Sequence, residues 1–272
     1  MRGDTTIEAV LRRDRAIVLA GLVATASLAW VWVLIGAGTG MSTFAMTTWS
    51  FPPPVMGVGA SAGAWSPANW LIMLAMWWVM MIAMMVPSAA PMILLYARVT
   101  RHAQARGQIA PTAVPTLAFA TGYLLAWLGF SVAAIALQWG LQRTGLVHAM
   151  TMWSTSAVLT GGLLMAAGLY QLTPLKHACL EHCRSPVEFL TGHWRPGRSG
   201  ALRMGAEHGA YCLGCCWFLM GLLFAGGIMN LVWIAGLAIL VLAEKVASLG
   251  HWLARTSGIA MIATSVYVLL IA

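Results

Sequence analysis

Five cysteines gather in two short stretches of the sequence, "CLEHC" and "CLGCC". This density of thiols indicates a metal or redox site, although the spacing is not a standard zinc-ribbon or ferredoxin pattern and does not name the metal. Cys179 and Cys183 are one helical turn apart, as are His208 and Cys212, so each pair shares a helix face. Thiolates are soft ligands that suit Cu(I), Zn(II) or iron–sulfur clusters. An odd number of cysteines excludes complete pairing into disulfides. The pattern predicts one metal site made by Cys179, Cys183, His208, Cys212, Cys215 and Cys216, with His182 as a further nitrogen ligand.

The ionisation of these thiols depends on where their helix begins. We expect "CLGCC" at the start of an apolar helix over 209–229, where the helix dipole favours thiolate over thiol. Lys176, Arg184 and Arg203 would offset the negative charge of several thiolates. The alternative is that the cysteines only pack as small buried residues.

A second candidate site is the methionine-rich stretch "MLAMWWVMMIAMMVPSAAPM". Thioethers bind Cu(I) and few other biological metals, so a methionine face on a helix can line a copper path. The alternative is that methionine fills gaps between helices or faces lipid. Two prolines follow and are expected to break the helix near its inner end, as a structural kink or hinge. The methionine face comprises Met73, Met76, Met80 and Met84. The two prolines are Pro87 and Pro91.

Glu244 and Lys245 lie inside another apolar segment, where ionisable groups are costly and usually face the protein interior. Adjacent residues on a helix point about 100° apart, so the two are not each other's partner. Glu244 is expected to accept from His208, His251 or Arg203, to lie near the metal, or to serve as a proton relay. The alternative is a structural salt bridge between helices. Lys245 is expected to reach the membrane interface or to support the metal site.

Composition indicates a membrane protein: 60% of the residues are hydrophobic, 8% are charged, and the mean hydropathy is +0.82. Soluble domains carry about 25% charged residues. We predict an all-α fold, a polytopic membrane helical bundle with about seven transmembrane helices in a single domain over 1–272. The predicted spans are 16–36, 69–95, 115–138, 153–173, 209–229, 231–250 and 256–272.

Basic residues predict the orientation of this bundle, because loops rich in arginine and lysine stay in the cytoplasm. They cluster before the first predicted span, after the second, and in a predicted cytoplasmic loop over 174–208. The predicted outer loop over 37–68 has no charged residue. The N-terminus is therefore expected in the cytoplasm and the C-terminus outside. The net charge of +8 reflects this asymmetry, and no nucleic-acid partner is expected.

Five blocks, "MMVPSAAPM", "LTPLKHACLEHCRSP", "HGAYCLGCCWFLM", "GGIMNLVW" and "AEK", resemble a bacterial family of predicted metal-binding integral membrane proteins. The resemblance covers about residues 69–250. It implies a multi-pass protein of the bacterial cytoplasmic (inner) membrane. It also adds Lys176 and Asn230 to Glu244 and Lys245 as groups that surround the metal or relay protons.

Three functions fit these features. The first is the handling of copper(I), by transport or by delivery to a metallochaperone or membrane partner, and copper is favoured because thioethers and thiolates occur together. The second is a membrane enzyme that uses a bound metal, zinc or iron included, or a reactive thiol. The third is a structural zinc site. The sequence has no phosphate-binding loop, nucleophile elbow or zincin motif, so catalysis stays open.

Overall fold

The computed structural model describes residues 2–52, 65–107 and 114–271, with residues 2–14 and 114 described by their backbone alone. This part of the chain is all helical and has no β-strand, which confirms the predicted fold class. The helices are α1 (Arg2–Leu34), α2 (Pro67–Ala105), α3 (Val114–Arg143), α4 (Ala157–Gln171), α5 (Pro174–Arg184), α6 (Pro186–His193), α7 (Gly197–Gly221), α8 (Leu223–Gly226), α9 (Leu231–Val246) and α10 (Gly250–Ile271).

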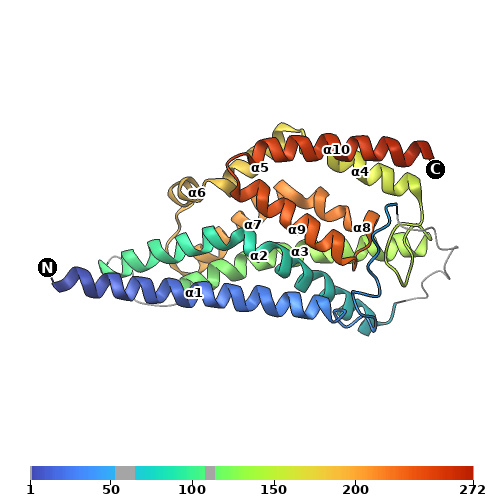
Figure 1. Cartoon of the computed structure of the whole chain (residues 1–272). Coiled ribbons are helices and arrows are strands. Elements are labelled where there is room, and N and C mark those ends of the chain that lie inside the picture. The colour runs from blue at the N-terminus through green and yellow to red at the C-terminus, as the bar shows by residue number, and fades with distance from the viewer. Residues whose placement is uncertain (1, 53–64, 108–113, 272) are drawn as a thin grey trace.

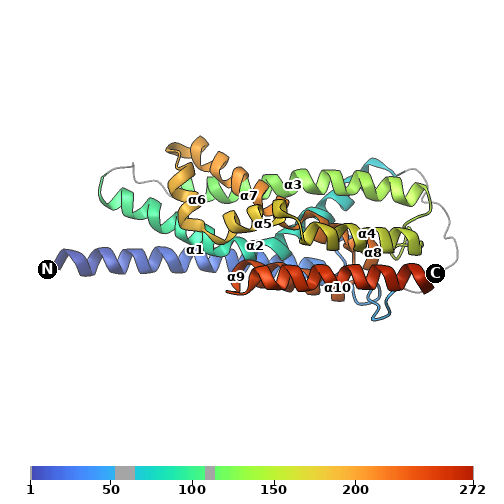
Figure 2. The same cartoon turned by 90° about the horizontal axis from the view of Figure 1, so that it is seen from above.

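The long helices run roughly along one axis, and the two chain ends lie at opposite ends of that axis (Figures 1 and 2). Helix α6 lies toward the end that holds the N-terminus, whereas α8 lies toward the other end. The most extensive packing is between α3 and α7, α1 and α2, and α4 and α10. Helix α7 also packs against α5, which brings the two cysteine-bearing helices together.

Close packing of α3 on α7 depends on glycine. A Cβ on Gly205 would collide with the Phe119 carbonyl, and a Cβ on Gly122 would collide with the Leu202 carbonyl. Small residues let two helix backbones approach closely, as is usual where apolar helices pack in membranes. The contact holds the inner face of α3 against the cysteine-bearing face of α7.

Within the described residues, five helical segments are long and apolar enough to cross a membrane, judged by length and composition. They comprise Arg15–Leu34 of α1, the whole of α2, Pro115–Arg143 of α3, Gly197–Gly226 through α7 and α8, and α10. Helices α4 and α5 are bent by 65° at their junction and would make a sixth crossing if taken together. Helix α9, over which we predicted a further span, has 16 residues, fewer than the roughly 20 of a typical crossing. The number of transmembrane helices, seven, therefore stays a prediction.

Two expectations about helix ends are wrong. Helix α7 begins at Gly197, so Cys212 lies about four turns inside it and the helix dipole does not favour its thiolate. The predicted loop 174–208 accordingly contains α5, α6 and the first turns of α7. Hydropathy marks where a helix becomes apolar, whereas Arg198, Arg203 and Glu207 are charged residues within the same helix.

Helix α2 also differs from expectation, because it continues through Pro87 and Pro91 to Ala105 without a break. Each proline removes one backbone donor, and the surrounding helical bonds remain. Residues 53–64 of the predicted outer loop lie outside the described residues. The described part of that loop packs on the start of α9, where the Asn230 amide donates to the Thr48 carbonyl at 3.1 Å.

Candidate metal centre

Three thiols lie inside the protein on one face of α7. Cys212, Cys215 and Cys216 are at most 2% exposed, and all five cysteines are free. The Cys215 and Cys216 thiols donate to the Cys212 carbonyl at 3.1 and 3.0 Å. From α5, the Cys183 side chain interacts with the Cys215 side chain. The structure thus brings the two cysteine stretches together. We call this set of four side chains the thiol cluster: the buried Cys212, Cys215 and Cys216 and the half-buried Cys183.

Cys212 is the most polar position of the thiol cluster. The Lys245 ammonium donates to its sulfur at 2.9 Å, and the Tyr123 hydroxyl lies 3.1 Å from the same sulfur. Lys245 is 8% exposed and also donates to the Ser88 hydroxyl at 3.1 Å. It therefore points at the thiol cluster, and the expectation that it reaches the membrane interface is wrong. A neighbouring cation favours thiolate over thiol, so Lys245 takes the role we had expected of the helix dipole.

His208 lies one turn before Cys212 and is 3% exposed. Its ring lies among Phe119, Tyr123 and Phe189, with ring centres 6.2, 5.9 and 5.3 Å away. Within the described residues its Nδ1 atom has no hydrogen-bond partner. Buried polar atoms are nearly always satisfied, so an unpartnered nitrogen here is suited to a ligand that the protein takes up.

Two of the predicted ligands stand apart from the thiol cluster. His182 is exposed, bonds to the Ala178 carbonyl at 2.9 Å, and stacks on Tyr211 with ring centres 4.4 Å apart. Cys179 is half-buried and packs against α7 at Gly214, where an added Cβ would lie 2.7 Å from its sulfur. The structure therefore places His182 outside the cluster and Cys179 at its edge.

The arrangement is not a preformed cage. Across the residues that the structure describes, no group of three or more His, Cys, Asp or Glu side chains is placed to hold a metal ion. The contacts present are thiol pairs, one ammonium and one unpartnered imidazole nitrogen. Such a set can hold a soft ion that needs few ligands, and it does not resemble a closed tetrahedral zinc site.

The methionine face of α2 points into the protein. Met76, Met80 and Met84 are at most 1% exposed, and Met73 is half-buried, with its sulfur 3.8 Å from the Gln138 amide. This face leads toward the thiol cluster, because the Met85 carbonyl accepts from the Tyr123 hydroxyl at 3.3 Å. The same hydroxyl contacts Cys212. Met76, Met80 and Met84 therefore face the interior of the protein, and Met73 lies at its edge.

Glu244 belongs to a separate buried network. It accepts from the Lys176 ammonium at 2.6 Å and from the Gln171 amide at 2.7 Å, and both ion-pair partners are almost fully buried. Its partner is thus Lys176, in place of the three donors expected from the sequence. Arg184 donates to the Glu244 backbone carbonyl at 2.8 Å and ties α5 to the end of α9.

A comparison with protein families bears on the functions that the geometry leaves open. Residues 74–268 match a family described as "PpoB2: Copper chaperone". The chain belongs to this copper chaperone family. Among curated proteins and solved structures, none matches the chain. The match confirms the expectation of a metal-handling family and favours copper as its metal.

The match to the copper chaperone family covers every residue of the thiol cluster, together with Lys245 and the Lys176–Glu244 pair. It begins at Leu74, so α1 and Met73 lie outside it. Asn230 lies inside the match, but the structure does not bring it to the thiols. Its side chain caps α9, accepting from the Val232 amide at 3.0 Å and donating to the Gly226 carbonyl at 3.0 Å.

Three residues that contact Lys245, Cys212 or Glu244 were not singled out from the sequence: Ser88, Tyr123 and Gln171. Ser88 lies in the "PSAAP" block between the two prolines. Tyr123 and Gln171 are polar side chains inside apolar spans, a position that usually requires an interhelical partner. Sequence position shows that such a partner is needed, but it does not show which helix supplies it.

The Lys176–Glu244 pair carries a prediction about stability. Replacing Lys176 with leucine is expected to lower the free energy of unfolding by about 3–5 kcal/mol, because it leaves a buried carboxylate without its cation. The double variant Lys176→Leu/Glu244→Leu should recover most of this loss, since it leaves neither charge alone. Thermal unfolding in detergent measures both variants. A single variant as stable as the wild type would show that the pair does not hold α5 to α9.

Proposed function

We propose that this protein is an integral membrane copper(I) chaperone, which carries Cu(I) as cargo on its buried thiols and delivers it to a partner protein. Membership of the copper chaperone family supports the metal. One contact supports the site: the buried Lys245 ammonium lies 2.9 Å from the Cys212 sulfur, among three further thiols. An ammonium at this distance favours a thiolate, the form in which cysteine binds metal.

Charge balance explains why a lysine belongs there. Without copper, one thiolate in the thiol cluster would neutralise Lys245. When Cu(I) binds between Cys212 and a neighbouring thiol, such as Cys215, the second thiol releases its proton. Two thiolates, one Cu(I) and one ammonium again sum to zero. The buried site therefore holds no net charge in either state, which avoids the large cost of burying an unbalanced ion.

The methionine face supplies a route toward this site. This face runs along α2 through Met73, Met76, Met80 and Met84. It ends beside Met85, whose carbonyl accepts a hydrogen bond from the Tyr123 hydroxyl, and the same hydroxyl contacts Cys212. Thioethers bind Cu(I) more weakly than thiolates do, so an ion would move from methionine to cysteine. His208 would provide a nitrogen ligand beside the thiols, since imidazole also binds copper.

Membrane insertion and orientation are parts of the same proposal. The long apolar helices and the basic loops support a bacterial inner-membrane protein with a cytoplasmic N-terminus. The placement of the chain ends at opposite ends of the long axis supports an odd number of crossings, seven in the proposed topology (Figures 1 and 2). Helices α5 and α6 then face the cytoplasm, where a soluble metallochaperone or a membrane partner would exchange copper.

Metal analysis of the purified full chain tests this function, with Cys212→Ser/Cys215→Ser as the matched variant. We expect the membrane fraction to yield wild-type protein that takes up near-stoichiometric Cu(I), and the double variant to lose it. Retention of zinc in place of copper, with loss of thermal stability on chelation, would instead indicate a structural zinc site. Equal copper in both proteins would refute the thiol site.

A further inference from the structure

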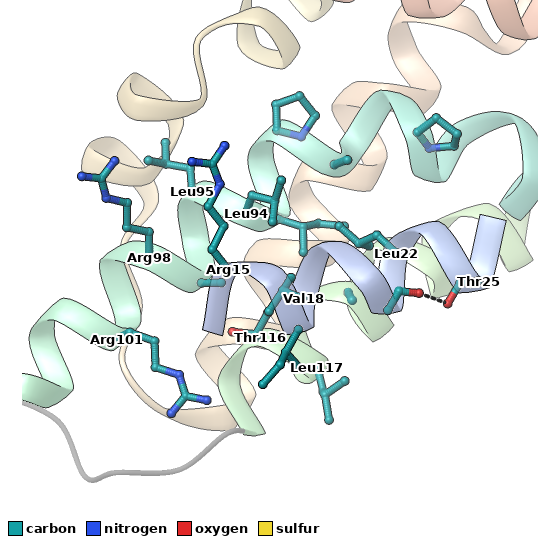
Figure 3. A pocket seen from close by; sticks show the side chains of 18 residues that line it. Arg15, Val18, Leu22, Thr25, Leu94, Leu95, Arg98, Arg101, Thr116 and Leu117 are labelled. Atoms are coloured by element: carbon teal, nitrogen blue, oxygen red, sulfur yellow. Dashed lines mark hydrogen bonds between the residues drawn. The ribbon is translucent and has the colours of Figure 1, made fainter. Parts of the chain in front are cut away.

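A groove that takes no part in the proposed copper site lies between α1, α2 and α3. Its volume is about 1050 Å³, which is at the upper end of ordinary ligand pockets. Along α1 it is lined by Val18, Gly21 and Leu22, and along α2 by Leu94 and Leu95. Figure 3 shows Val18 and Leu22 of α1 beside Leu94 and Leu95 of α2. The wall is therefore mainly aliphatic.

Charge gathers at one end of this groove. Arg15 of α1 and Arg98 and Arg101 of α2 stand at the end toward the N-terminus of α1, whereas Leu22 and Thr25 lie at the other (Figure 3). The lining residues include no aspartate or glutamate. In the described part of the chain, neither Arg15 nor Arg98 forms an ion pair. Among the described side chains that line the groove, the arginine end is therefore positively charged and opens onto an aliphatic wall.

The length of the groove matches one leaflet of a bilayer. From Arg15 to Thr25 the α1 backbone rises about 15 Å, which is half of the roughly 30 Å hydrocarbon thickness. In the proposed topology the arginine end lies at the cytoplasmic surface. A ligand that fits this groove has a negatively charged head at the interface and an aliphatic tail of leaflet depth.

We propose that the groove binds an anionic phospholipid of the cytoplasmic leaflet, with its phosphate against Arg15 and Arg98 and an acyl chain along Leu22 and Leu94. Basic pockets between membrane helices on the cytoplasmic side are suited to such head groups. The proposal rests on the membrane insertion proposed above and is independent of copper. It assigns α1, which lies outside the family match, a role in forming a lipid site.

The test measures lipid retained by the purified full chain in native mass spectrometry. Phosphatidylglycerol, phosphatidylcholine with the same acyl chains, and inorganic phosphate are each added to the protein in detergent. We expect phosphatidylglycerol to be retained at least about ten-fold better than phosphatidylcholine. Arg15→Gln/Arg98→Gln should lower its retention about ten-fold or more, given roughly 1 kcal/mol for each basic residue. Arg101 is left intact because it also bonds to Gln104.

A second variant tests the aliphatic wall separately from the charges. A Cβ on Gly21 meets no atom within 4 Å, so this position has room for a side chain, and Gly21→Leu is chosen to fill the groove. We expect it to lower phosphatidylglycerol retention with all three arginines present. The matched controls are Gly129→Leu, at an equally open position on α3, and Arg143→Gln, which lies over Trp139. Both should retain lipid as the wild type does.

Several results would overturn the proposal. Equal retention of phosphatidylcholine would remove the head-group selectivity, and full retention by Gly21→Leu would remove the acyl-chain site. Protection from thermal unfolding by inorganic phosphate alone, equal to that by lipid, would indicate a free anion as the ligand. Recovery of the protein from the soluble fraction would refute membrane insertion as well. Loss of lipid selectivity in a membrane-embedded protein refutes the groove alone.

Discussion

Replacing Cys212 with serine is expected to weaken Cu(I) binding by more than about 100-fold, since loss of supporting residues alone costs 10–100-fold at metal sites. A serine hydroxyl does not ionise near neutral pH, and its hard oxygen is a poor ligand for Cu(I). The substitution also removes the sulfur that Lys245 and Tyr123 contact. Competition against a chromophoric Cu(I) chelator, with the protein purified in detergent, measures the affinity.

Cys179→Ser is the control for this experiment. The Cys179 sulfur packs against Gly214 at the edge of the thiol cluster, and no hydrogen bond joins it to the other thiols in the described chain. Its replacement should change the affinity only a few-fold. Equal losses of Cu(I) affinity in the two variants would show that Cys212 has no special role among the thiols. An unchanged affinity in Cys212→Ser would refute the site.

Replacing Lys245 with leucine is expected to lower the Cu(I) affinity at neutral pH by about 10–100-fold, as for other residues that support metal ligands. Without the ammonium, Cys212 keeps its proton, so copper must displace two protons in the variant and one in the wild type. Because metal binding competes with protons, affinity in the variant should rise more steeply with pH. The defect is therefore largest at low pH and shrinks as pH increases.

Affinities measured across a pH series provide this slope. Lys245→Arg keeps the positive charge and should keep the wild-type slope, although its larger head will weaken the contact with Ser88. Leucine is chosen for the neutral variant because methionine would add a thioether beside the cluster. Identical pH slopes in the leucine variant and the wild type would show that Lys245 does not control the ionisation of Cys212.

Local periodicity predicted much of the candidate site. The spacing of His208, Cys212 and Cys215 places them on one helix face, and the structure buries all three. The Met76–Met84 face is likewise continuous and internal, although the sequence left open whether it faced lipid. Both results follow from the 3.6-residue repeat, which depends on neighbours in the chain alone.

The pairing of helices could not be predicted in the same way. Lys245 bonds to Cys212 across 33 positions of sequence, and Lys176 pairs with Glu244 across 68. Such partners depend on how whole helices pack, through contacts such as that of Gly205 on Phe119. The start of α7 was predicted at the wrong residue for another reason. Hydropathy shows which part of a helix can lie in the membrane, but it does not show where the helix itself begins.

The depth of Cys212 within α7 also bears on how quickly an ion could be exchanged. About four helical turns separate it from the start of the helix, and the sulfur is fully buried. Under the proposed function, a docked soluble protein would contact the surface and not Cys212, so cargo held there would leave through ligand exchange at the half-buried Cys183 or Cys179. The lifetime of the loaded state would then be determined by local opening between α5 and α7, and tight binding and slow release would be separate properties of the protein.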